Sequence, residues 1–290
     1  MIRHIGLGCV VAAASVAAGQ TSELYINQYD NRGMVVVQGG GVVRSWDTVN
    51  PGETALAVAD TVRTAGNYWF GNNATGAEYN LSGSPLGPTY TIIGGGNWFD
   101  GATDGRFNYA VQHNGDYNLY RFDREWGSPE VLFNVGFATS GITVDPKNGT
   151  FWVSDSLSRL VRNLDQSGNE LSSFLADDGS YAYGLAMDPV DGTLWVGGFG
   201  SNVIYQYDAN GDLLSSVAVP GIGSAFGMEF AVAAGECLAD FNGDGIVDTR
   251  DVLAFLNAWN NDDAASDCDG NGVIDTRDVI CFLNAWTAGC

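Results

Sequence analysis

Two stretches of sequence decide the fold: GITVDPKNGTFWVSD, which begins at Gly141, and GLAMDPVDGTLWVGG, which begins at Gly184. They start 43 residues apart, and GMEF begins a third copy after the same interval, at Gly227. Each full copy alternates apolar and polar residues, passes an Asn-Gly or Asp-Gly turn and enters an aromatic strand, which is the pattern of a β-hairpin. A strand-rich repeat of about 40 residues predicts a series of similar small sheets.

Two further strands follow each hairpin, most clearly in residues 159–174 and 202–217, so one unit has four strands. Looser copies begin at Thr54 and Asn97.

The two ends of this region complement each other. The segment from Ser22 has the pattern of a second, third and fourth strand, whereas the segment from Gly227 is a first strand without successors. Pairing them closes a ring and removes its free edges, which predicts an all-β β-propeller. Five blades are favoured, and six are allowed if residues 66–96 contain extra strands. A two-sheet sandwich explains the alternation, but it explains neither the repeat nor the complementary ends.

The chain divides into three parts. Residues 1–19 have a basic start, a short apolar stretch and small residues before Gln20, which is typical of a secretory signal peptide. The propeller then occupies residues 20–236, and a small C-terminal domain occupies residues 237–290. No later segment is apolar for long enough to span a membrane. We therefore expect a secreted or cell-surface protein, extracellular or periplasmic.

The charge limits the partners. With 34 acidic against 12 basic residues, the formal charge is -22, which disfavours nucleic acid and anionic lipid. The 45% hydrophobic content excludes a wholly disordered chain.

The propeller region resembles a broad family of secreted propellers that includes gluconolactonase-like and NHL-repeat proteins. The shared motif, Asp-Pro-x-Asn/Asp-Gly-x-aromatic-Trp-Val, specifies fold rather than chemistry, because such propellers serve as lactonases, lyases, sugar binders and protein-binding platforms. The resemblance makes Asp100, Asp188 and Glu229 candidates for a catalytic or metal site in the channel. No Glu-Asn-Asp set of the gluconolactonase kind stands at recognisable positions, and the Pro after Asp188 also explains that residue as part of a turn.

Other side chains could contribute to a binding surface. We interpret His113, which precedes Asn-Gly, as a surface histidine in a hairpin turn. Tyr181, Tyr183 and Phe199 are aromatic residues that could stack on sugar rings or belong to the core.

The C-terminal domain contains two similar 12-residue segments, DFNGDGIVDTRD from Asp240 and DCDGNGVIDTRD from Asp267. Both match a calcium loop, which places oxygen ligands at positions 1, 3, 5, 7, 9 and 12 and glycine at position 6. The predicted ligands of two calcium ions are Asp240, Asn242, Asp244, Ile246, Asp248 and Asp251 in the first loop, and Asp267, Asp269, Asn271, Val273, Asp275 and Asp278 in the second. Ten acidic residues against two basic ones repel one another here, so folding should depend on calcium.

Each loop leads into a helix, VLAFLNAW from Val252 and VICFLNAW from Val279, with apolar residues at helical spacing. We expect the two helices to pack on each other through this face. An ordinary EF-hand also has an entering helix and a Glu at position 12, and this sequence has neither.

A duplicated loop and helix with Asp at position 12 resembles the dockerin module, and the cysteines resemble those of planctomycete-type dockerins. The resemblance implies a non-catalytic module that, when loaded with calcium, docks on a cohesin-type or other cell-surface scaffold protein. Positions 10 and 11 of each loop carry recognition in that family, together with the adjacent helix face. In this sequence these positions are Thr249, Arg250, Thr276 and Arg277, and the helix residues are Leu256, Asn257, Leu283 and Asn284.

Export favours disulfide bonds among the four cysteines of this domain, which allow three pairings. Because the ends meet in an antiparallel pair of loop-helix units, we favour Cys237 with Cys290, and Cys268 with Cys281.

These observations predict a binding protein whose tail anchors it while the propeller displays a surface for a glycan or a protein. The alternative is a hydrolase or lyase of carbohydrate or lactone, tethered by the same tail. Convergence of Asp100, Asp188 and Glu229 at one mouth of the channel would favour the enzyme.

Overall fold

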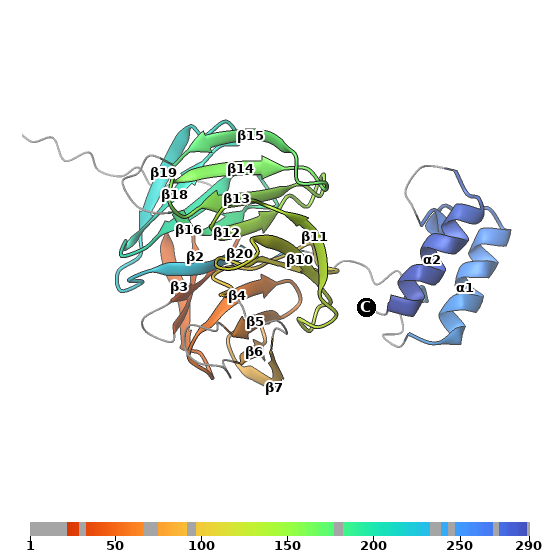
Figure 1. Ribbon diagram of the computed structural model, residues 1–290. Coiled ribbons are helices and arrows are strands. Elements are labelled where there is room, and N and C mark those ends of the chain that lie inside the picture. Colours follow the sequence, from red (N-terminus) through yellow and green to blue (C-terminus); the bar gives the residue numbers. More distant parts are fainter. Residues whose placement is uncertain are drawn as a thin grey trace, which may run out of the picture.

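The structure is a computed structural model that describes residues 22–28, 33–66, 75–91, 97–176, 182–232, 239–242, 247–268 and 273–288. Its strands form five four-stranded antiparallel sheets arranged around a centre (Figure 1). The predicted β-propeller is therefore confirmed with five blades, and the six-bladed alternative is wrong.

Each blade is one sheet, and the first strand named in each is the innermost. The first comprises β4 (Glu53–Val58), β5 (Val62–Gly66), β6 (Gly76–Tyr79) and β7 (Pro85–Tyr90). The second comprises β8 (Ala102–Thr103), β9 (Asn108–Val111), β10 (Asn118–Phe122) and β11 (Glu130–Asn134). The third comprises β12 (Thr139–Val144), β13 (Phe151–Asp155), β14 (Leu160–Leu164) and β15 (Glu170–Leu175). The fourth comprises β16 (Ala182–Met187), β17 (Leu194–Gly198), β18 (Val203–Tyr207) and β19 (Leu213–Ala218). The fifth comprises β20 (Ala225–Phe230), β1 (Leu24–Gln28), β2 (Gly33–Gln38) and β3 (Gly41–Asp47).

The fifth blade closes the ring from both ends of the propeller sequence, as predicted. Strand β20 pairs antiparallel with β1, so that Leu24 lies opposite Phe230 and Ile26 lies opposite Met228. This pairing satisfies two strand edges that would otherwise be open.

The glycines of the 43-residue repeat allow the inner strands to approach one another closely. A Cβ atom at Gly141 on β12 would lie 2.9 Å from the Tyr183 carbonyl oxygen on β16, and one at Gly184 would lie 2.9 Å from the Phe226 carbonyl oxygen on β20. Both distances are shorter than a carbon side chain tolerates. The repeated glycines are therefore explained by the close packing of the inner strands as well as by the hairpin pattern.

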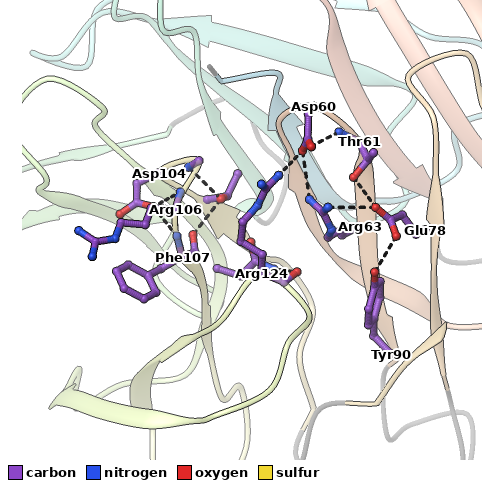
Figure 2. Close-up of polar contacts among 12 residues, drawn as sticks. Asp60, Thr61, Arg63, Glu78, Tyr90, Asp104, Arg106, Phe107 and Arg124 are labelled. Atoms are coloured by element: carbon purple, nitrogen blue, oxygen red, sulfur yellow. Dashed lines mark hydrogen bonds and ion pairs between the residues drawn. The ribbon is translucent and has the colours of Figure 1, made fainter. Parts of the chain in front are cut away.

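Ion pairs join the first and second blades near the turn between β4 and β5 (Figure 2). Arg63 contacts Glu78 at 3.0 Å and Asp60 at 3.2 Å, and Arg124 of the second blade also pairs with Asp60. Tyr90 donates a hydrogen bond of 2.7 Å to Glu78. Partial burial raises the pKa of Asp60, but the charges of Arg124 and Arg63 outweigh it and lower that pKa.

The tail forms two helices, α1 (Thr249–Asn260) and α2 (Thr276–Ala288), with a short 3-10 helix at Ala264–Ser266. Their buried Phe255 and Phe282 rings stack with centroids 4.1 Å apart. Both helices begin three residues before the apolar pattern that predicted them. The reason in α1 is its cap, because the Asp248 carboxylate accepts the Arg250 N–H at the first turn.

The predicted bond between Cys268 and Cys281 is present, with Cα atoms 5.9 Å apart. Cys237, Cys290 and the predicted signal peptide lie outside the described residues. Among the helices that the structure describes, none is both long and apolar enough to cross a membrane.

The close approach at Gly141 predicts that adding a single methyl group there, as alanine, destabilises the propeller. Gly141→Ala should lower the free energy of unfolding by about 2 kcal/mol, because the new Cβ meets Leu185 and the Tyr183 carbonyl. Gly41→Ala on the outer strand β3 is the control, since no atom lies within 4 Å of its added Cβ. Denaturant unfolding of both variants measures the difference, and equal stabilities would contradict the packing requirement.

Candidate functional site

The centre of the propeller contains a buried carboxylate, Asp100, which lies just before the second blade's inner strand. Its Oδ1 accepts the N–H groups of Gly101 at 2.9 Å and Met228 at 3.0 Å. Its Oδ2 accepts those of Ile142 at 3.1 Å and Leu185 at 2.9 Å. One side chain thus connects the inner strands β12, β16 and β20 to its own blade.

Glu229 on β20 is the second buried acid at this centre and is 1% exposed. Its Oε1 accepts the Phe230 N–H at 3.1 Å and has a long contact, 3.5 Å, with the Thr143 hydroxyl. Its Oε2 has no hydrogen-bond partner within the part of the chain that the structure describes. Burial, followed by the charge of Asp100, raises the pKa of Glu229.

The two acids differ in where a proton can bind. Burial raises the pKa of Asp100 too, but four N–H donors oppose this rise and occupy all four in-plane lone pairs of the carboxylate. A proton on Asp100 would break one of these bonds, whereas Glu229 has an oxygen without a partner among the described residues. We therefore assign the negative charge to Asp100 and the proton to Glu229.

Asp188, the third candidate, does not join this pair. It follows β16, where its Oδ1 accepts the Val190 N–H at 2.9 Å and the Ser22 hydroxyl at 2.8 Å. These bonds hold the turn between β16 and β17 and attach the start of the described chain to it. The structure brings two of the three predicted acids together and places the third in a turn.

His113 lies in the turn that follows β9, but its predicted surface position is wrong. The ring is half-buried, packs against Phe99 with centroids 4.3 Å apart, and places Nδ1 2.9 Å from the Thr139 carbonyl oxygen. Burial lowers its pKa. Nothing near His113 in the sequence indicated this, because both partners come from other parts of the chain.

An aromatic cluster surrounds Phe99 near the points where the inner strands begin. We call Phe99, Tyr183, Phe199 and Phe226, together with the His113 ring, the mouth cluster. Its ring centroids lie 4.3–6.2 Å apart along a continuous series of contacts. Phe226 is buried and Phe199 is 50% exposed, so core and surface meet at this cluster. Tyr181 lies outside the described residues.

In the tail, the closing aspartates of both predicted calcium loops are fully buried. Asp251 accepts the N–H groups of Asn242 at 3.1 Å and Asp248 at 2.8 Å. Asp278 accepts the N–H of Asp275 at 2.8 Å. Each closing carboxylate therefore also binds the backbone at the start of its own helix.

The position-9 aspartates have a second repeated interaction. Arg250 binds Asp248 through Nε and Nη2, and Arg277 binds Asp275 in the same way. These two ion pairs are exposed, so we assign them an orienting role rather than a large stabilisation.

Each helix also supports the opposite loop. The Trp259 indole donates to the Asp275 carbonyl at 2.8 Å, and the Trp286 indole donates to the Asp248 carbonyl at 3.0 Å. The two halves are therefore related by an approximate twofold arrangement in which each loop depends on the other helix.

The predicted ligand set has the chemistry that calcium prefers, because every described member offers oxygen. These members are Asp240, Asn242, Asp248, Asp251, Asp267, Val273, Asp275 and Asp278, whereas Asp244, Ile246, Asp269 and Asn271 lie outside the described residues. Within the described part of the chain, no three His, Cys, Asp or Glu side chains form a group that could hold a metal.

Residues 8–227 match the SMP-30/gluconolactonase/LRE-like region, and the chain belongs to this family. The match covers most of the propeller, so the predicted resemblance to gluconolactonase-like proteins is confirmed for that part. No curated protein matches the chain.

Several solved structures are similar to this chain at low identity. A chain of a nidogen/laminin complex is 15% identical with a TM-score of 0.51, and the match covers 73% of this chain and 99% of that chain. A protein of unknown function from Bacteroides caccae is 14% identical with a TM-score of 0.43, covering 68% and 73% of the two chains. Virginiamycin B lyase from Staphylococcus aureus is 11% identical with a TM-score of 0.42, covering 68% and 67%. The first likeness supports the propeller fold and no particular activity.

The hydrogen bonds of Asp100 predict that even a nearly isosteric substitution at this position destabilises the propeller. Asp100→Asn places an amide NH₂ against backbone N–H donors and leaves buried donors unsatisfied, so the free energy of unfolding should fall by roughly 3 kcal/mol. Asp188→Asn is the matched control, because its Oδ1 can still accept from Val190 and Ser22. Thermal and denaturant unfolding compare the two, and a smaller loss for Asp100→Asn than for Asp188→Asn would refute the assigned role.

Proposed function

We propose that the protein is an exported, non-catalytic binding and anchoring protein. Its calcium-loaded tail docks on a cohesin-type or other cell-surface scaffold, while the propeller displays a surface that binds a glycan or a protein. The observation that carries this proposal is the pair of matching loop-helix units, in which both closing aspartates are buried at helix starts.

Calcium would add positive charge beside these buried carboxylates. Asp251 and Asp278 accept backbone N–H groups, but a hard divalent ion provides much stronger compensation for a buried charge. Arg250 and Arg277 pair with the position-9 carboxylates, so the positive charge of these arginines also lies beside the loops. Two ions per chain would offset part of the charge of the ten acidic residues in this segment.

The surface beside the loops supports docking. Thr249 and Arg250 are exposed in the first turn of α1, and Thr276 and Arg277 are exposed at the same positions of α2. The apolar side chains exposed nearby also match in pairs: Leu253 with Ile280, at 62% and 60%, and Leu256 with Leu283, at 39% and 41%. Polar and apolar groups thus recur on both helices, and protein interfaces combine groups of both kinds.

The disulfide supports export. A bond between Cys268 and Cys281 is typical of an oxidising compartment, which agrees with the predicted secreted or cell-surface location.

The centre of the propeller favours binding over catalysis. Asp100 has all its lone pairs occupied by backbone donors, and Asp188 belongs to a turn. The second candidate, a hydrolase or lyase of carbohydrate or lactone tethered by the same tail, is supported by the family and by Glu229. A buried acid that retains its proton could serve as a general acid.

Calcium titration of the full chain tests the tail. Calorimetry should show two ions bound per chain, and Asp251→Asn should weaken one site by about 10-fold or more, because a ligand charge is lost. Asp262→Asn, at an exposed acid between the loops, is the control and should leave both affinities unchanged.

Hydrogen exchange provides a readout that needs no variant. Chelator should speed amide exchange in residues 249–260 and 276–288 and leave the propeller strands unaffected. Helices equally protected with and without calcium, or a titration without binding, would contradict the proposal.

A further inference from the structure

The mouth cluster lies on the face of the propeller where the inner strands begin. Tyr183 is the second residue of β16 and Phe226 is the second residue of β20, while Phe99 immediately precedes Asp100 and the inner strand of the second blade. Rings from three blades therefore meet at one end of the channel, directly beside the Asp100 anchor.

The hydrogen bond of His113 determines which of its nitrogens can bind a ligand. The Thr139 carbonyl oxygen can only accept, so Nδ1 carries the proton at this 2.9 Å contact. In the neutral ring Nε2 then keeps its lone pair, and the contacts of the imidazole with Thr139 and Ser140 are both made by Nδ1. Burial favours this neutral form by lowering the pKa. The cluster thus offers one fixed acceptor next to aromatic rings.

The aromatic part of the cluster is accessible at its outer edge. Phe199 is 50% exposed, and its ring lies 5.4 Å from that of half-buried Tyr183. The adjacent carboxylate of Asp100 is turned to the backbone of the inner strands, where its four bonds lie. A ligand at this mouth would therefore meet flat apolar rings and a neutral acceptor.

A sugar ring complements these features, since one face presents C–H groups and its edge presents hydroxyl donors. We propose that the mouth cluster binds a sugar ring of a glycan, with the ring stacked on Phe199 and Tyr183 and a hydroxyl donating to His113 Nε2. This inference rests on the proposed binding function of the propeller and assigns its ligand class and position.

The propeller has a second possible sugar-binding location, and a substitution there serves as the control. A groove of about 510 Å³ at one end of the fifth blade is lined by Trp46, Asp47, Gln28 and Pro220, among others. Its aromatic and polar side chains are also suited to sugars, but it lies beside the outer strands β2 and β3.

Calorimetry of the full chain with cellohexaose, maltohexaose, xylohexaose, laminarihexaose and chitohexaose tests the proposal. At least one should bind, and Phe199→Ala should weaken that binding by about 10-fold through loss of stacking. His113→Phe preserves a ring against Phe99 and should weaken it by about 5-fold through loss of the acceptor. Trp46→Ala should leave the affinity unchanged.

The histidine gives a direct second readout. His4, in the predicted signal peptide, is the other histidine of the chain, so the ring nitrogens of His113 can be assigned in a ¹⁵N spectrum. The Nε2 resonance should shift when the bound oligosaccharide is added, because that nitrogen accepts a new hydrogen bond.

Three results would overturn the inference. Affinity unchanged in both Phe199→Ala and His113→Phe, or lost in Trp46→Ala alone, would place the sugar elsewhere and leave propeller binding intact. Absence of binding to all five oligosaccharides would refute the sugar assignment, while calcium binding by the tail would still be judged by its own titration.

Discussion

The carboxylate of Asp100 is the constraint on which the rest of the propeller depends. It accepts backbone N–H groups from the inner strands of three other blades and from Gly101 beside it, and the glycines of the repeat let these strands come within reach. A charge buried this deeply is stable only when its oxygens are fully hydrogen-bonded. Asp100 therefore has a structural role at the centre of the channel, whereas the mouth cluster includes the half-exposed Phe199.

In the tail, carboxylates are likewise stabilised by hydrogen bonds, here around a small core. Its closing aspartates bind the backbone at the helix starts, its position-9 aspartates bind arginines, and each tryptophan holds the opposite loop. The two halves also share the Phe255–Phe282 stack, so each helix packs directly on the other. Under the proposed function, calcium would supply further charge compensation, and ion binding would then be coupled to ordering of the helices.

The repeat, the complementary ends, the hairpins and the loop-helix pattern could be read from the sequence because each depends on residues close together or on regular spacing. The role of Asp100 could not, since its donors lie 42, 85 and 128 residues away. His113 was misplaced for the same reason. On the helices, Leu256 and Leu283 follow the predicted apolar pattern yet remain exposed, because one partner helix covers only part of a helix surface.

The ionisation state of Asp100 tests this account most directly. In protein labelled with ¹³C at the aspartate carboxyls, the Asp100 resonance should have the chemical shift of a carboxylate at neutral pH, since four backbone N–H donors stabilise the charged form. A resonance with the shift of a protonated carboxyl at neutral pH would contradict it, because the proton would then lie on Asp100 rather than Glu229 and the central acid would be available for chemistry.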